Sequence, residues 1–507
     1  MMLQYPALDQ GTDQIRLLRF RERSENACLN FLLETADLVK GSFAALSYTW
    51  ESPEVLREPS GNVIQPLTWT SEQRDACRIK VNGADFNVTR NLHNFLQSLA
   101  DTQLCGSAIF VDQICINQAD AHEKTHQLGL MSRIYSKATG VVAWVSPRVP
   151  WKRFDTALQR LFSDSALQSF LKHPDTSSVS TSERARLEED ATGIANEVAE
   201  ALYSRYWSRQ WVVQELLLAK ELIIHIGEYW FEWEVLLGLL SRYSIFADAD
   251  LTSLPPQLLP LHGDKSRGGW LIPRLLDILS HKQQELARCG TYRPKRLSEV
   301  LVKFGGRDCK KQRDKVFSLL GLAKTAILPD MHTPIGLLYL SVLSEGLFDY
   351  YRPDANCEDS AWKATNLIHA SLAACGLEIW HPTVALITDR ILSRFLPDSK
   401  TRNSWIVQVW FFQEYGLQHK FNDLTFWIRC VSIHIRYWKV RRHLGRSQKF
   451  DEMMFLPEID HETERWGMVN KSYREWLEFA DTITPRSSHV VHEQNQHHHK
   501  QHSACRS

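Results

Sequence analysis

The chain has 507 residues, of which 44% are hydrophobic and 23% charged, a balance typical of folded domains with buried cores. Its 59 basic and 59 acidic residues cancel, so composition gives no electrostatic argument for nucleic acid or an anionic membrane as a partner. The N-terminus lacks the features of a signal peptide, and no apolar run approaches the roughly 20 residues that span a bilayer. We therefore expect a cytoplasmic protein without a transmembrane segment, whose ten cysteines are free thiols.

The first ninety residues contain the signals of two hairpins. The stretches QIRLLRF and ACLNFLLE alternate loosely and predict an early hairpin that leads to a strand at 43–48. Asn82-Gly83, the strongest short hairpin signal, separates two further runs at 77–81 and 84–88. We predict an inserted β-ribbon there, outside the crossover order of the main sheet.

Residues 107–146 have the pattern of a βαβ unit. Two short apolar runs, 108–114 and 140–145, predict buried strands on either side of one helix. Asp120 is placed to cap that helix, and Glu123 follows at the spacing of a capping box. A crossover of this kind makes the strands parallel and leaves the loop 115–118 at the carboxyl edge of the sheet, where open α/β sheets bind ligands.

Helices and strands continue to alternate after this unit. We predict helices at 153–172 and 183–203, separated by a Ser/Thr-rich linker, then a Trp-rich helix at 204–219 and a strand at 222–226. The alternation predicts one mainly parallel sheet that contains the strands at 43–48, 108–114, 140–145 and 222–226.

The second half reads as mainly helical. This pattern divides the chain into an α/β domain at 1–235, a mainly α-helical domain at 236–483 and a disordered His-rich tail at 484–507. Basic and aromatic residues interleave at 427–449, either as a solvated helix face or as a surface for phosphates or membrane. The predicted helices span 270–288, 297–304, 334–350, 361–376 and 402–415.

Three motifs carry a family resemblance. FAALSYTW at 43–50, IFVDQICINQADAHE at 109–123 with QLGLMSRIYSKA after it, and SRYWSRQWVVQELLLA at 204–219 resemble the opening, central and closing motifs of the fungal heterokaryon-incompatibility (HET) domain. QRDKVFSLLGLA at 312–323 is similar to a segment that commonly follows this domain. The resemblance implies an effector of programmed cell death in non-self recognition, which acts with an incompatibility partner protein or by self-association. The chain departs from the family pattern at Glu51, where glycine is usual, and at Ser146.

His122-Glu123-Lys124-Thr125-His126 fits H-E-x-x-H, the helix signature of zinc peptidases. A helical wheel places both histidines opposite the apolar stripe, beside Arg133, so zinc would face solvent next to a cation. We therefore predict no metal site, and a zinc metallopeptidase remains a minor alternative.

Glu215 is the candidate catalytic residue. Trp207, Trp211 and Glu215 are spaced i, i+4, i+8 and would line one side of the predicted helix, where the aromatic rings partly desolvate the carboxylate. The interval from Trp211 to Glu215 resembles the Trp-Cys-x-x-Glu motif of TIR domains, whose glutamate is catalytic for NAD cleavage in enzymatic members. A buried structural contact is the alternative interpretation of Glu215.

The similarity to TIR domains implies a doubly wound, flavodoxin-like sheet with NAD as the substrate and no required cofactor. Aromatic residues after the first strand would stack a ring, and amides of the central loop would hydrogen-bond ribose or phosphate. The alternative is that these polar residues only satisfy loop backbone groups, in a non-catalytic signalling module. The binding candidates are Tyr48, Trp50, Asp112, Asn117, Gln118 and Trp211.

Overall fold

The structure is a computed structural model, and its described residues form two compact units. The first unit comprises the described residues within 1–295, 306–324 and 328–331, and the second comprises those within 296–305, 325–327 and 332–376. The first therefore extends past the boundary expected at 235. The described residues are 3–9, 11–24, 28–50, 76–101, 106–145, 151–174, 179–201, 204–227, 229–242, 271–333, 335–350, 367–368 and 370–376.

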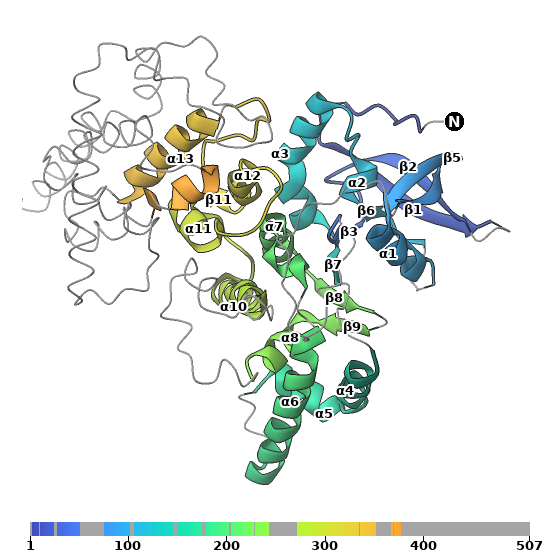
Figure 1. Ribbon diagram of the computed structural model, residues 1–507, viewed down its shortest axis with the longest axis vertical. Coiled ribbons are helices and arrows are strands. Elements are labelled where there is room, and N and C mark those ends of the chain that lie inside the picture. Colours follow the sequence, from blue (N-terminus) through green and yellow to red (C-terminus); the bar gives the residue numbers. More distant parts are fainter. Residues whose placement is uncertain are drawn as a thin grey trace, which may run out of the picture. The chain divides into compact units, whose positions relative to one another are not determined.

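The first unit is built on one mixed sheet whose described strands run in the order β5-β4-β2-β1-β6-β3-β7-β8-β9 (Figure 1). Its four central strands are parallel neighbours, which confirms the predicted parallel sheet. Strand β3 lies between the two strands of the predicted βαβ unit, so Ala44 pairs with Ile109 on one side and Gly140 on the other. These central strands are β6 (Ile109–Phe110), β3 (Ala44–Ser47), β7 (Gly140–Val145) and β8 (Leu222–Ile226).

Both predicted hairpins form. Strand β1 (Gln14–Arg23) pairs antiparallel with β2 (Leu29–Asp37), and β4 (Ala76–Val81) pairs with β5 (Ala84–Thr89). Asn82 and Gly83 have φ of 51° and 80°, the left-handed conformations that a two-residue hairpin turn requires.

The second hairpin lies at the edge of the main sheet, outside the parallel crossover order of the central strands, and it pairs with β2. The side chain of Asn82 is the reason, because it accepts a hydrogen bond from the Leu33 N–H at 2.8 Å and donates to the Leu33 carbonyl at 3.0 Å. These bonds hold the turn against β2, and β4 then pairs parallel with β2.

The strand predicted at 108–114 is shorter than expected. It ends at Phe110, and the chain turns into the short helix α2 (Asp112–Cys115). The Asp112 carboxylate accepts a hydrogen bond from the N–H of Gln113 at 2.7 Å, which favours the turn. Asp112 therefore starts the helix at the end of the strand instead of lying within it.

Helix α3 (Ala121–Lys137) begins as predicted. The Asp120 side chain accepts hydrogen bonds from the N–H groups of His122 at 2.9 Å and Glu123 at 3.0 Å. The capping box is incomplete, because the Glu123 carboxylate reaches past Asp120 to the Asn117 N–H.

The Trp-rich segment is not one helix, contrary to expectation. It consists of a 3₁₀ turn, η2 (Arg205–Ser208), and helix α7 (Gln210–Leu218), joined by an extended residue, Arg209, with φ −68° and ψ 138°. At this break the Gln210 N–H donates to the Asp308 carbonyl at 2.8 Å, which pairs the chain with a segment about a hundred residues downstream.

The helix predicted at 153–172 forms as two helices, Trp151–Ser163 and Ser165–Lys172, because the Asp164 side chain caps the second one by accepting the Leu167 N–H at 2.9 Å. Helix α8 (Trp233–Leu240) was not predicted, and neither were the next two elements. Strand β9 (Tyr229–Glu232) forms an unpredicted hairpin with β8 after Gly227, and helix α12 (Asp314–Leu320) lies in the segment resembling the one that follows HET domains. The other helices are α1 (Arg90–Ala100), α4 (Trp151–Ser163), α5 (Ser165–Lys172), α6 (Thr181–Ala201), α8 (Trp233–Leu240) and α10 (Leu271–Cys289).

The second unit contains the predicted helices α11 (Leu297–Phe304) and α13 (Ile335–Tyr350), and a helical stretch at 367–375 of which residue 369 is not described. In the described parts of both units, no helix is long and apolar enough to cross a bilayer. Several predictions concern residues that the structure does not describe. These are the helix at 402–415, the basic and aromatic stretch at 427–449, the tail at 484–507, and the departures from the family pattern at Glu51 and Ser146.

Candidate functional site

A pocket of about 590 Å³ opens in the first unit beside the carboxyl end of β3. One side is formed by the chain after β3, helices α2 and α3, and the start of α7, and the other by residues 308–315. This volume lies within the range of ordinary small-molecule sites. Its charged and aromatic lining residues are Trp50, Asp112, Lys124, Arg209, Trp211, Glu215, Asp308, Lys310, Lys311, Asp314 and Lys315.

Glu215 lies on α7, buried to 4% exposure, and contributes to the pocket lining. Its carboxylate accepts a hydrogen bond from the hydroxyl of Ser47, whose Oγ is also 2.5 Å from the Tyr206 hydroxyl. Burial raises the pKa of Glu215 to about 7, although the charge of Arg209 and the Ser47 hydrogen bond act in the opposite direction. The carboxyl group can therefore exchange its proton near neutral pH.

Asp112 is the second carboxylate of the pocket. The Trp50 Nε1–H donates to its two oxygens at 3.1 and 2.9 Å, so the indole and the carboxylate hold one another in place. Burial raises the pKa of Asp112, while the charge of Arg209 and the hydrogen bond from Trp50 lower it. Arg209 itself donates to the Tyr48 carbonyl and influences both carboxylates, so a cation lies close to the two acids.

The wall of the pocket formed by residues 308–315, the downstream wall, was not predicted. Residues 306–324 are held against the sheet domain by backbone and side-chain bonds: the Arg307 guanidinium donates to the Trp207 carbonyl at 2.8 Å, and the Asp308 N–H donates to the Ser208 carbonyl at 2.7 Å. Gly321 approaches α3 and α7 so closely that a methyl group there would collide with Ser132 and Gln214. The motif QRDKVFSLLGLA was the available signal, but Lys315 within it and Lys310-Lys311 just before it resemble a solvated charge run.

The structure brings most sequence-predicted site residues together. Five of the seven line the pocket, and the remaining two, Tyr48 and Asn117, lie outside its lining. Tyr48 is buried, and its hydroxyl donates to Gln113 at 3.3 Å, while the Asn117 amide oxygen accepts the Ala119 N–H within its own loop. The five lining residues are Trp50, Asp112, Gln118, Trp211 and Glu215.

Two further sequence expectations need adjustment. Trp207, expected beside Trp211 and Glu215, belongs to η2, is fully buried, and is not part of the pocket lining. The side chain of Gln118 is already used within the loop, where its Nε2 donates to the Asp112 carbonyl at 3.0 Å.

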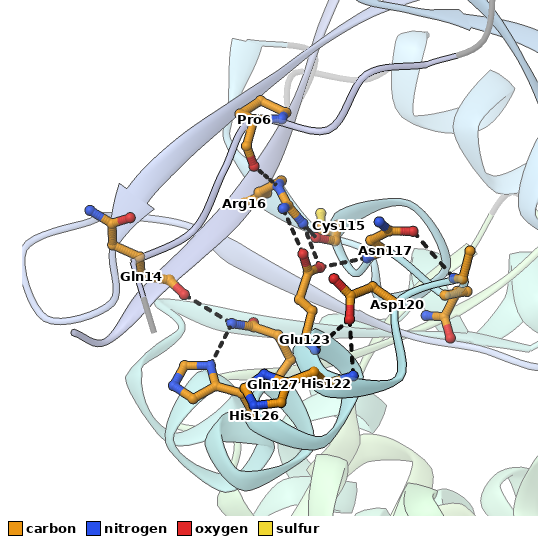
Figure 2. Close-up of polar contacts among 12 residues, drawn as sticks. Pro6, Gln14, Arg16, Cys115, Asn117, Asp120, His122, Glu123, His126 and Gln127 are labelled. Carbon is orange, nitrogen blue, oxygen red and sulfur yellow. Dashed lines mark hydrogen bonds and ion pairs between the residues drawn. The ribbon is translucent and has the colours of Figure 1, made fainter. Parts of the chain in front are cut away.

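Glu123 of the H-E-x-x-H sequence lies in a different environment (Figure 2). Its two oxygens accept hydrogen bonds from the buried Arg16 guanidinium at 2.7 and 2.8 Å, and one of them also accepts the Asn117 N–H at 2.7 Å. His122 is exposed, and His126 contacts Gln127 beside it. The zinc-peptidase alternative loses its general base, because this carboxylate is committed to Arg16.

The described residues contain no group of three or more His, Cys, Asp or Glu side chains arranged to hold a metal ion. The pocket offers the carboxylates of Asp112, Glu215, Asp308 and Asp314, two tryptophan rings and basic side chains.

Comparison with known proteins supports the resemblance. Residues 43–215 match the family described as Heterokaryon incompatibility protein (HET). Over 330 residues the chain is 30% identical to "Heterokaryon incompatibility protein 6, OR allele" of Neurospora crassa, an alignment that covers 58% of this chain and 45% of that relative. The chain thus aligns with less than half the length of this curated protein. No solved structure matches it.

Proposed function

We propose that this chain, a fungal HET-domain protein through residues 43–215, acts in heterokaryon incompatibility and cell death by cleaving NAD in the pocket lined by Glu215. The observation that carries the enzymatic part is the position of Glu215. It is a buried carboxylate with a pKa raised to about 7, and it lines a pocket of ligand size together with two tryptophans. Such an environment is how proteins prepare a carboxyl group for chemistry at neutral pH.

In the proposed reaction the bond between the nicotinamide nitrogen and ribose C1′ breaks. The bonding electron pair leaves with nicotinamide, which loses its positive charge, and the ribose becomes an oxocarbenium-like cation. The ionised Glu215 stabilises this cation electrostatically until water adds to C1′ and releases a proton. The products are nicotinamide and ADP-ribose.

The aromatic lining suits the nicotinamide end of such a substrate. Trp50 and Trp211 line the same pocket as Glu215, and Trp50 is fixed through its hydrogen bonds to Asp112. A cationic pyridinium ring is attracted both to aromatic faces and to carboxylates. The two acids and two tryptophans therefore favour a cationic ring beside Glu215.

The test compares Glu215→Gln with the parent chain in an assay of NAD consumption and nicotinamide release. Glutamine keeps the size and accepts the Ser47 hydrogen bond, but it has no charge. We expect turnover to fall by about 10² to 10³. Glu221→Gln is the matched control, because Glu221 is an exposed glutamate outside the pocket lining.

Cell killing after expression in a fungal host supplies the second measurement. Loss of killing in Glu215→Gln but not in Glu221→Gln supports the proposal. A parent chain that kills without consuming NAD, or a Glu215→Gln chain that kills as well as the parent, would identify a non-catalytic signalling module instead.

A further inference from the structure

The charges that line the pocket are unevenly distributed. On one side, Lys124 of α3 and the wall at 308–315 together carry four lysines and two aspartates. The side around Glu215 carries one basic residue, Arg209, and two acids, Glu215 and Asp112. The four lysines are Lys124, Lys310, Lys311 and Lys315, and the aspartates among them are Asp308 and Asp314.

The lysines are close enough to affect one another. Burial lowers the pKa of the half-buried Lys124, and the nearby charges of Lys311 and Lys310 lower it further. Gathering like charges is unfavourable unless counter-charges balance them. Asp314 offsets part of this repulsion, but the wall retains more positive than negative groups.

This wall is held in place by hydrogen bonds and by buried side chains on either side of it. Arg307 precedes it and is buried. Its guanidinium donates to the Trp207 carbonyl at 2.8 Å, and its backbone N–H donates to Gln210 Oε1 at 3.2 Å. Helix α12 begins within the wall at Asp314, and its Val316 and Phe317 are buried in the core. The lysines are therefore carried on a segment that is fixed to the same unit as Glu215.

We propose that Lys124 and Lys311, with Lys310 and Lys315 of the same pocket lining, bind the diphosphate of a dinucleotide whose cationic ring lies beside Glu215. The inference rests on the proposed function and extends it in two ways. It names the side chains that hold the diphosphate of NAD, and it adds the segment 308–315, outside the family match at 43–215, to the site. Ammonium groups form charge-assisted hydrogen bonds with phosphate oxygens, which gives the wall its selectivity.

The test measures binding by calorimetry to the full chain carrying Glu215→Gln, so that turnover does not interfere. The probes are NAD, ADP-ribose, inorganic pyrophosphate and nicotinamide riboside, which lacks the diphosphate. Lys124→Gln and Lys311→Ala are each expected to weaken the first three by about tenfold, and to leave nicotinamide riboside unchanged. Lys220→Ala, at an exposed lysine outside the pocket lining, is the control and should bind all four like its parent.

The outcomes separate this inference from the proposed function. Lysine-dependent binding of pyrophosphate and ADP-ribose supports the diphosphate site even if the parent chain does not cleave NAD. Glu215-dependent cleavage of NAD with equal affinities in parent and lysine variants overturns the diphosphate site and leaves the proposed function intact. Failure of the parent to bind pyrophosphate and ADP-ribose, or an equal loss of nicotinamide riboside affinity, also overturns it.

Discussion

Glu123 and Glu215 are both buried glutamates of the first unit, with 6% and 4% exposure, yet their surroundings differ. Glu123 accepts two hydrogen bonds from Arg16 and one from a backbone N–H, so its negative charge is fully balanced. Glu215 accepts one hydrogen bond from Ser47, and among the described residues it forms no ion pair within 4 Å. Arg209 acts on it only at longer range.

The difference shows that burial alone does not mark a functional carboxylate. At Glu123 the counter-charge is supplied by the fold, and the bidentate pair ties strand β1 to helix α3. At Glu215 the protein leaves the negative charge partly uncompensated beside a pocket. A bound cation, or a cationic transition state, would supply the missing charge there.

We expect the largest effect on stability from a substitution of Glu123, whose charge Arg16 balances. Glu123→Gln removes the partner of Arg16, whose side chain is 1% exposed, and leaves a buried positive charge without its counter-ion. We expect the free energy of unfolding to fall by about 3 to 5 kcal/mol, measured by chemical denaturation.

Glu34→Gln provides the matched control, because Glu34 pairs with Arg19 on the same sheet while both side chains are about 40% exposed. Its loss should cost less than about 1 kcal/mol. Equal losses in the two variants would contradict the distinction drawn for Glu123.

Glu215→Gln should have the opposite effect on stability, and the effect should depend on pH. Folding raises the pKa of Glu215 from 4.5 to about 7, so its protonation stabilises the folded chain. That stabilisation is fully present below about pH 4.5 and is lost as the pH rises through about 7. Glutamine does not titrate, so the variant should gain stability relative to the parent between these values, on the order of 3 kcal/mol in total.

Unfolding free energies at pH 5 and pH 8 give this difference directly, with Glu221→Gln as the exposed control. A variant that is less stable than the parent at pH 8 would place Glu215 with Glu123 as a structural residue.

Ser47→Ala should produce the smallest change. The Ser47 hydrogen bond lowers the pKa of Glu215, so its removal should raise that pKa further. We expect the midpoint of the pH profile of NAD cleavage to move upward by about one pH unit, which corresponds to one hydrogen bond to a charged group. Ser42→Ala is the control, because Ser42 is an exposed serine before the same strand, and it should leave the profile unchanged. A midpoint that moves downward in Ser47→Ala would contradict the role assigned to the Ser47 hydrogen bond.

The parallel order of the central strands could be predicted because apolar runs alternate with helical periods from 43 to 226. The carboxyl edge then follows from topology, and it places Trp50, Asp112 and Gln118 near one another. Glu215 was predicted as a site residue from its spacing to Trp211. The single helix expected to carry Trp207 on the same side is interrupted at Arg209. No proline or glycine marks that interruption, and the bridge to Asp308 that accompanies it is remote in sequence.

Two features escaped prediction because they depend on long-range partners. Arg16 is one of four arginines in strand β1, and periodicity gives no indication that this one is buried against Glu123. Lys310 and Lys311 follow the matched family region by almost a hundred residues, and only the folded chain places them in the pocket.

The position of β3 also has a consequence for how the chain folds. Because β3 lies between β6 and β7, the strands joined by α3 have no hydrogen bonds to each other and cannot form a sheet by themselves. Each of them pairs with β3, which lies more than sixty residues earlier in the sequence. Closing such long loops costs chain entropy before any hydrogen bonds between the strands can form. Contacts of such high sequence separation slow folding, so the centre of the sheet forms late and depends on the N-terminal segment being present.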